Sequence, residues 1–118
     1  VFATGAMVWK SLEAAELLAQ QHIEAKVINV STIKPLDSAA VLRAMEGAAL
    51  LVSVEEHSVI GGLGSAVAEC ISERAGTPRL LRMGVQDQFG ESGLADELLE
   101  KHGLQPSGIA TQILSSLS

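Results

Sequence analysis

The chain has 118 residues, of which 47% are hydrophobic and 3% aromatic, and 8 basic against 14 acidic side chains give a formal net charge of −6. This length suits a single domain with a real core, and that core must be built from Ala, Val, Leu and Ile because aromatic residues are so few. No Lys/Arg stripe could follow the phosphates of a duplex, which argues against a nucleic-acid partner. The apolar runs are shorter than the roughly 20 residues that span a bilayer, which argues against a membrane.

The cysteine count and the first residues bear on localisation and completeness. The single Cys70 rules out an internal disulfide and suits a reducing cytoplasm, and its place on an apolar helix face predicts a buried thiol. No basic segment precedes the apolar start, so we expect no signal peptide. We expect residues 1–118 to be one cytoplasmic domain. Because residues 1–4 look like a strand without a beginning, we expect this domain to be a fragment of a longer chain.

The first half of the chain alternates strand and helix patterns. After the strand of residues 1–4, residues 6–21 predict a helix whose core face carries Val8, Leu12, Ala15 and Ala19 and whose opposite face carries Lys10, Glu13 and Gln20. Trp9 lies off that stripe and marks either an interface or a half-buried helix edge. Residues 24–30 predict a second strand, and Asp37 is the expected cap of a short helix over residues 38–45.

The middle of the chain concentrates its unusual chemistry. An apolar run over residues 48–54 predicts a strand that leads into Glu55, Glu56 and His57. A glycine-rich turn at Gly61, Gly62 and Gly64 follows, and a helical stripe then begins at Leu63. Open α/β sheets usually bind ligands at the carboxyl ends of their strands, and free N–H groups at a helix start attract anions. Glu55 and Glu56 would repel an anion.

The segment from Gly62 to Val67 is similar to the dinucleotide-binding pattern G-x-G-x-x-G but departs from it. Val67 stands where Gly or Ala is needed, residues 55–60 intervene after the strand, and no acidic residue stands about 20 positions on. We therefore favour a structural role for the glycines, namely a tight turn and close packing of the helix on the sheet.

The last third of the chain continues the alternation. Residues 80–85 predict a fourth strand, and Phe89 is the one large apolar anchor of the polar loop that follows. Residues 94–102 predict a helix that ends at Gly103, and Pro106 opens a final helix.

Catalytic and metal-binding patterns are weak. The three histidines are far apart, and neither a nucleophile elbow nor a phosphate-binding loop occurs. Glu55, Glu56 and His57 form the only candidate acid/base set, but adjacent strand residues point to opposite faces. We expect no catalytic residue, no metal site and no cofactor site within this chain.

Four segments together resemble the C-terminal domain of transketolases. They are Ala3-Thr4-Gly5, residues 30–37 (Val-Ser-Thr-Ile-Lys-Pro-Leu-Asp), residues 52–69 with Glu55-Glu56-His57 and Gly61-Gly62-Leu63-Gly64, and residues 84–93 with Phe-Gly-Glu-Ser-Gly. The deoxyxylulose-phosphate synthases and the β subunits of 2-oxoacid dehydrogenase E1 share the Gly-Gly-x-Gly segment.

This resemblance implies an α/β/α three-layer sandwich on a mixed, mostly parallel five-stranded sheet with one antiparallel edge strand. It implies a structural and assembly domain of a transketolase, or of a split transketolase's C-terminal subunit, which moves a two-carbon ketol unit between sugar phosphates. Thiamine diphosphate and its divalent metal ion would be bound by other domains, which are also the expected partners, in a homodimeric parent enzyme.

One alternative is the equivalent domain of a deoxyxylulose-phosphate synthase or of a 2-oxoacid dehydrogenase E1 β subunit. The other is a regulatory module that binds a small anion at the glycine-rich helix start. Lys34 or Arg82 would then lie near Gly61, Gly62, Gly64 and Ser65. Under either interpretation, Lys34, Glu55, Glu56, His57 and the glycine turn form the candidate interface or ligand loop.

Overall fold

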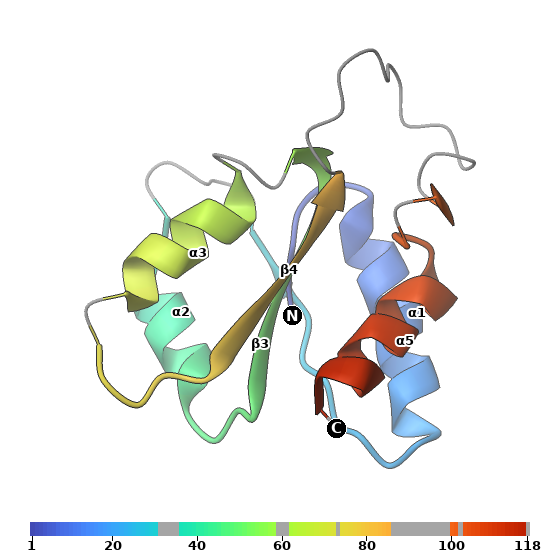
Figure 1. The fold of residues 1–118 in the computed structure, drawn as a ribbon, viewed down its shortest axis with the longest axis horizontal. Helices are drawn as coiled ribbons and strands as arrows, with labels where there is room; N and C mark the ends of the chain where they lie inside the picture. Colours follow the sequence, from blue (N-terminus) through green and yellow to red (C-terminus); the bar gives the residue numbers. More distant parts are fainter. Residues whose placement is uncertain (31–35, 59–61, 73, 86–99, 102, 118) are drawn as a thin grey trace.

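The computed structural model describes residues 1–30, 36–58, 62–72, 74–85, 100–101 and 103–117. Within these ranges, strands and helices alternate as the sequence predicts (Figure 1). In chain order they are β1 (Phe2–Ala3), α1 (Met7–Ala19), β2 (Ile28–Asn29), α2 (Ser38–Met45), β3 (Leu50–Ser58), α3 (Leu63–Ile71), β4 (Arg79–Val85) and α5 (Pro106–Leu117).

The described strands form one parallel sheet in the order β2-β1-β3-β4. The register pairs Phe2 with Ile28 on one side and with Ser53 on the other, and it pairs Leu51 with Leu80. The family resemblance implies a fifth, antiparallel edge strand, and that strand is not among the four described ones. The parallel order follows from the connections, because each described crossover contains a helix.

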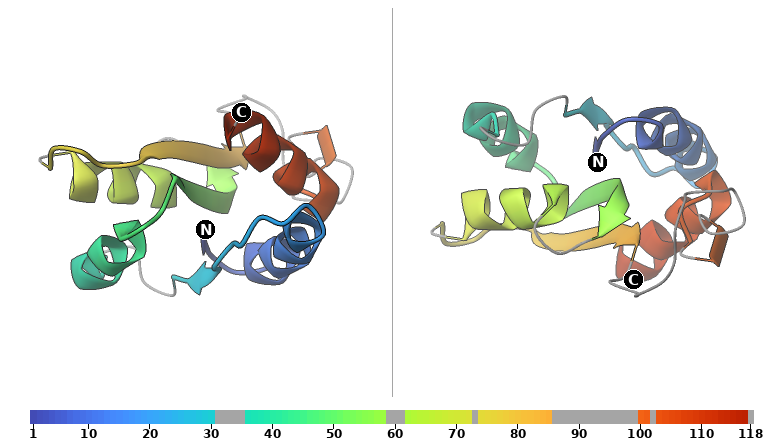
Figure 2. Two further views of the ribbon diagram at one scale, coloured as in Figure 1. Left: turned by 90° about the horizontal axis from the view of Figure 1, so that it is seen from below. Right: turned by 90° about the horizontal axis from the view of Figure 1, so that it is seen from above.

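Helices cover both faces of this sheet, as Figures 1 and 2 show. α1 and α5 lie together on one face, and α2 and α3 lie on the other. Each face has its own apolar cluster, one built around Val52 and Val54 with α1 and α5, the other around Leu51 with α2 and α3. The predicted α/β/α sandwich is therefore confirmed.

Local signals fix several element ends. The Asp37 side chain accepts a hydrogen bond of 3.1 Å from the Ala40 amide, which confirms the predicted cap of α2. Gly103 has a positive φ of 72°, as expected for a glycine that ends a helix, and Pro106 occupies the first position of α5.

The predicted core face of α1 is wrong. The buried residues of this helix are Met7, Lys10, Ser11, Ala14 and Leu18, whereas Leu12 is 52% exposed. The prediction gave weight to apolar residues and assigned Lys10 to solvent. The true face mixes Ser11 and Lys10 with apolar residues, because Lys10 finds a polar partner on α5's side of the molecule.

Two further expectations are corrected. The strand predicted over residues 48–54 is longer than expected, because β3 continues through Glu55 and Glu56 to Ser58. Cys70 is half-buried at the margin of the α2/α3 cluster, and the prediction of a buried thiol is wrong to that extent.

Phe89 and nearly all of the helix expected over residues 94–102 lie outside the described residues. None of the helices in the described ranges has the length and apolarity that crossing a bilayer requires.

Candidate functional site

The candidate site lies at the carboxyl edge of the sheet, where the chain winds in opposite directions from two neighbouring strands. β1 and β3 are adjacent; β1 leads into α1 on one face, and β3 leads towards α3 on the other. Such a switch point is where open parallel sheets usually place ligands. The end of β3 brings Glu55 and Glu56 to this edge, as the sequence predicts.

Glu55 is a buried carboxylate, 1% exposed, that binds the first turn of α3. Its Oε1 accepts a hydrogen bond of 2.8 Å from the Leu63 amide, and its Oε2 accepts one of 2.9 Å from the Gly64 amide. Gly62, the residue before the helix, has no side chain with which to cap it. Glu55 therefore satisfies two amides that would otherwise lack a partner at the helix start, and its negative charge suits the helix dipole there.

Gly64 brings α3 against the sheet more closely than any residue with a Cβ could. A Cβ at this position would lie 2.8 Å from Ser53 Oγ and 2.8 Å from Arg82 Cδ. Ser53 is completely buried, and its hydroxyl has no hydrogen-bond partner in the structure. This confirms the predicted close packing at Gly64.

The other predicted site residues divide into three groups. Glu56 is half-buried, and because it follows Glu55 in a strand it faces the other side of the sheet. Gly62 and Ser65 are half-buried beside the helix start. Lys34 and Gly61 lie outside the described residues, as does the side chain of His57.

Lys10 is a polar residue of the interior that sequence patterns missed. It is 5% exposed, its Nζ donates a hydrogen bond to Oε1 of Gln105, and it lies 4.5 Å from the centre of the Trp9 ring. The two hydrogen-bonded residues are 95 positions apart in the chain, so no local pattern could have linked them. This contact ties α1 to the turn before α5.

With this geometry established, comparison with known proteins gives the family. Residues 1–109 match the family model described as the transketolase, C-terminal domain. The chain belongs to the transketolase C-terminal domain family. Its Gly-Gly-x-Gly segment and buried Glu55 are thus features of a transketolase C-terminal domain.

Individual relatives agree with this assignment. The chain is 55% identical over 104 residues to the 6-deoxy-6-sulfo-D-fructose transketolase subunit SqwH of Clostridium sp. (strain MSTE9), covering 88% of this chain and 32% of that protein. It is 40% identical over 114 residues to the 1-deoxy-D-xylulose-5-phosphate synthase of Caldanaerobacter subterraneus subsp. tengcongensis, covering 97% of this chain and 18% of that one.

A solved structure shares the fold closely. The "split gene transketolase, inactive beta4 tetramer" superimposes with a TM-score of 0.88 at 40% identity, covering 98% of this chain and 38% of that one. This chain therefore spans well under half the length of these relatives.

The transketolase family uses thiamine diphosphate, and the described residues do not fit a diphosphate at α3. The amides of Leu63 and Gly64 already bind the Glu55 carboxylate, whose charge would also repel a second anion. Within the described ranges, no cluster of three or more His, Cys, Asp or Glu residues could hold a metal ion.

Proposed function

We propose that this chain is the non-catalytic C-terminal assembly domain of a transketolase that transfers a two-carbon ketol unit between sugar phosphates. The observation that carries the proposal is the position of Glu55. The helix start that would serve best as an anion site is occupied by a carboxylate of the same domain. A helix that is capped and packed in this way supports a structural role. It stabilises the fold of this domain, and the folded domain then holds the neighbouring domains together.

The proposal includes the remaining features that the family resemblance implies for the parent enzyme. Thiamine diphosphate and a divalent metal ion are bound by its other domains or by a separate subunit, and the assembled enzyme is a cytoplasmic homodimer. Its complete C-terminal sheet has a fifth, antiparallel edge strand. The contact surface at the carboxyl edge includes Glu56 and extends to His57 and Lys34.

The experiment compares the isolated chain with the complex that the chain forms in its natural source. The isolated chain should give no metal-dependent heat of binding with thiamine diphosphate in calorimetry and no ketol transfer from a ketose phosphate to an aldose phosphate. The complex recovered with the tagged chain from its natural source should carry out this transfer. Micromolar cofactor binding by the isolated chain would overturn the proposal.

One alternative concerns the parent reaction. Because this chain is also 40% identical to a 1-deoxy-D-xylulose-5-phosphate synthase, the same complex should be assayed for formation of 1-deoxy-D-xylulose 5-phosphate. The name of the 55% identical relative makes 6-deoxy-6-sulfo-D-fructose a further donor to test. The reaction that the complex carries out identifies the parent enzyme.

The other alternative is the anion-binding regulatory module. Its site would have to displace Glu55 or lie beside it, towards Arg82, whose exposed side chain reaches Gly64. Stabilisation of the isolated chain by inorganic phosphate, lost on Arg82→Gln, would favour this alternative.

A further inference from the structure

Helix α1 carries an apolar stripe that the core of this chain does not use. The stripe consists of Val8, Leu12, Ala15 and Ala19, which lie within about 60° of one another around the helix. Leu12 is 52% exposed and Ala19 is exposed, whereas Val8 and Ala15 are half-buried. The buried face of α1 is a different one, so this helix has two apolar sides where a surface helix usually has one.

The spacing of the α1 stripe suits a second helix. Its residues are separated by four, three and four positions, which matches the 3.5-residue repeat along which packed helices meet. Ala15 and Ala19 are small, so another helix can approach closely at that end. The exposed side of a helix is convex, whereas sites for small molecules are concave. The stripe therefore favours a helix, and not a small ligand, as its occupant.

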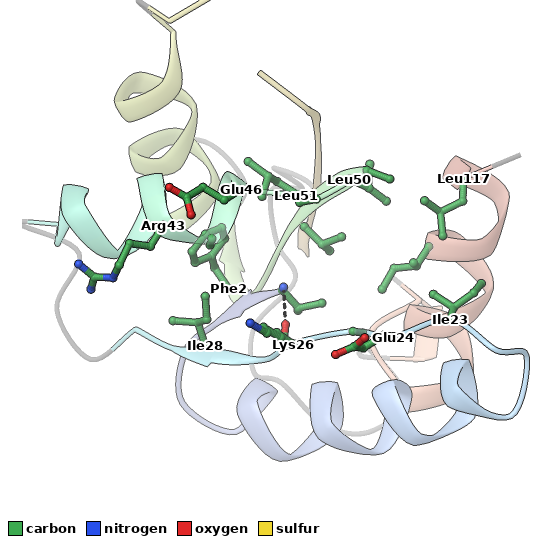
Figure 3. A pocket seen from close by; sticks show the side chains of 18 of the residues that line it. Phe2, Ile23, Glu24, Lys26, Ile28, Arg43, Glu46, Leu50, Leu51 and Leu117 are labelled. Atoms are coloured by element: carbon green, nitrogen blue, oxygen red, sulfur yellow. Dashed lines mark hydrogen bonds between the residues drawn. The ribbon is translucent and has the colours of Figure 1, made fainter. Parts of the chain in front are cut away.

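The α1 stripe is separate from the pocket of this molecule at the amino-terminal edge of the sheet (Figure 3). That pocket has a volume of about 630 Å³ and is lined by Val1, by residues 22–26 and by the end of α5. None of the stripe residues lines it. A helix bound along the stripe would therefore leave this pocket open.

Trp9 stands beside the stripe as an anchor that is already held in place. Its side chain is 50% exposed, and its ring centre lies 4.5 Å from Nζ of Lys10. Lys10 is held in turn by its hydrogen bond to Gln105. A side chain that is fixed before binding loses little conformational freedom on binding, and tryptophans often dominate the energy of an interface.

The charges beside the stripe indicate the chemistry of the partner. Glu13 and Glu16 are exposed on the same side of α1 as Trp9. Lys10 is the one basic residue of this helix and is turned inwards, so α1 itself offers these carboxylates no exposed cation. A partner helix with Lys or Arg beside its apolar residues would complement them. A second copy of this chain would bring the same glutamates, and each copy has a net charge of −6.

We propose that the α1 stripe, with Trp9 as its anchor, binds an amphipathic helix of a different polypeptide that carries Lys or Arg beside its apolar residues. α5 packs on the side of α1 that carries Lys10, and the stripe lies roughly opposite, so the bound helix leaves the contact between α1 and α5 intact (Figure 2). This proposal does not depend on the proposed function.

The first experiment compares the isolated chain with the complex recovered with the tagged chain from its natural source. Hydroxyl-radical footprinting measures how fast exposed side chains are oxidised, and we expect Trp9 and Leu12 to be oxidised about threefold or more slowly in the complex. Leu17 is the internal control, because it is 37% exposed on the same helix but about 140° from Leu12. Its rate should be the same in both samples.

Substitutions test the apolar contact and the charge separately. Leu12→Asp and Glu16→Lys should each weaken the association in the complex about tenfold or more. The matched controls are Leu17→Asp on α1 and Glu69→Lys on α3, where Glu69 is exposed on the other face of the sheet. Both controls should leave the association within about twofold. Denaturation of the isolated variants shows that each still folds, and the footprint needs no variant.

A photo-reactive leucine analogue in place of Leu12 identifies the occupant. It should cross-link to residues three or four positions apart in a different polypeptide, as on one side of a helix. Cross-links to another copy of this chain would overturn the proposal. Unchanged oxidation of Trp9 and Leu12 in the complex would also overturn it, as would equal losses of association from Glu16→Lys and Glu69→Lys.

Discussion

At the scale of single residues, Glu55 determines how the middle of the chain folds. Its carboxylate is buried between the end of β3 and the start of α3, and it accepts hydrogen bonds from two amides eight and nine residues away. A buried carboxylate is tolerated only where hydrogen bonds offset its lost hydration. These two bonds make Glu55 a structural residue.

We predict that Glu55→Ala lowers the free energy of unfolding by about 2–4 kcal/mol, because it leaves the Leu63 and Gly64 amides buried without an acceptor. Glu55→Gln should cost less, since its one carbonyl oxygen can still accept. Chemical denaturation measures both, with Glu56→Gln as the matched control at about 0.5 kcal/mol or less. A loss below about 1 kcal/mol for Glu55→Ala would contradict the capping role.

At Gly64, helix α3 packs closely against Ser53 of the sheet. We predict that Gly64→Ala destabilises the chain by about 1–3 kcal/mol, because its Cβ would overlap Ser53 Oγ and Arg82 Cδ. Ser53→Ala alone should be nearly neutral or stabilising, since it removes a buried hydroxyl without a partner. The loss from Gly64→Ala should shrink in the Ser53→Ala background; an unchanged loss in this double-mutant cycle would show that Arg82 is the obstacle instead.

At the scale of elements, α1 shows how packing overrides a simple apolar stripe. The helix buries Ser11 and Lys10 and exposes Trp9, Leu12 and Leu17. Its packing against α5, with the hydrogen bond from Lys10 to Gln105, sets which side faces inwards.

We predict that Leu18→Ala costs about 2–5 kcal/mol of stability, because Leu18 is 1% exposed in the core. Leu12→Ala, the same change on the same helix, should cost about 0.5 kcal/mol or less because Leu12 faces solvent. Thermal or denaturant unfolding of the two variants decides between the helix faces. Equal losses would mean that the helix is rotated relative to this description.

The thiol of Cys70 gives a chemical test of which face of α3 is buried. Because Cys70 is half-buried, we expect a thiol reagent to label it in the folded chain, more slowly than in the unfolded chain. The labelling rate should stay constant through low denaturant concentrations, since access does not require global unfolding. Cys70→Ser is the control for other reactive groups. A rate that follows the unfolding equilibrium from the first addition of denaturant would place the thiol in the core.

At the scale of the whole molecule, the sheet has two distinct ends. The carboxyl edge carries Glu55 and Glu56, and the amino edge carries the pocket around Val1. Interfaces between domains are more polar than obligate interfaces, which suits a contact surface at the carboxyl edge.

We predict that Glu56→Lys leaves the isolated chain folded, with a change of about 0.5 kcal/mol, and weakens its association with the rest of the parent enzyme. Glu56→Gln removes the charge without reversing it and should have a smaller effect. Analytical ultracentrifugation of the complex and denaturation of the isolated chain measure the two quantities. Unfolding of the isolated Glu56→Lys chain would show that this carboxylate has a structural role. If Glu56→Lys changed neither the stability of the isolated chain nor the association, the contact surface would lie elsewhere.

The sequence alone predicted the alternation of strands and helices, the Asp37 cap, the Gly103 terminator and the family. These features depend on local patterns: hydrophobic periodicity, turn residues and motifs within continuous segments of the chain. The close packing at Gly64 was also predicted, because a glycine has no Cβ and permits close approach of the backbone.

Only the tertiary structure decided the rest. Three features depend on contacts between segments distant in the chain: the helix start binds Glu55, α1 turns Lys10 inwards, and a pocket lies beside Val1. Lys10 and Gln105, 95 positions apart, share no local pattern, and a carboxylate beside a glycine turn can either repel a ligand or occupy its site. The sequence placed the right residues at the right edge of the sheet, and the three-dimensional packing determined which of them bind one another.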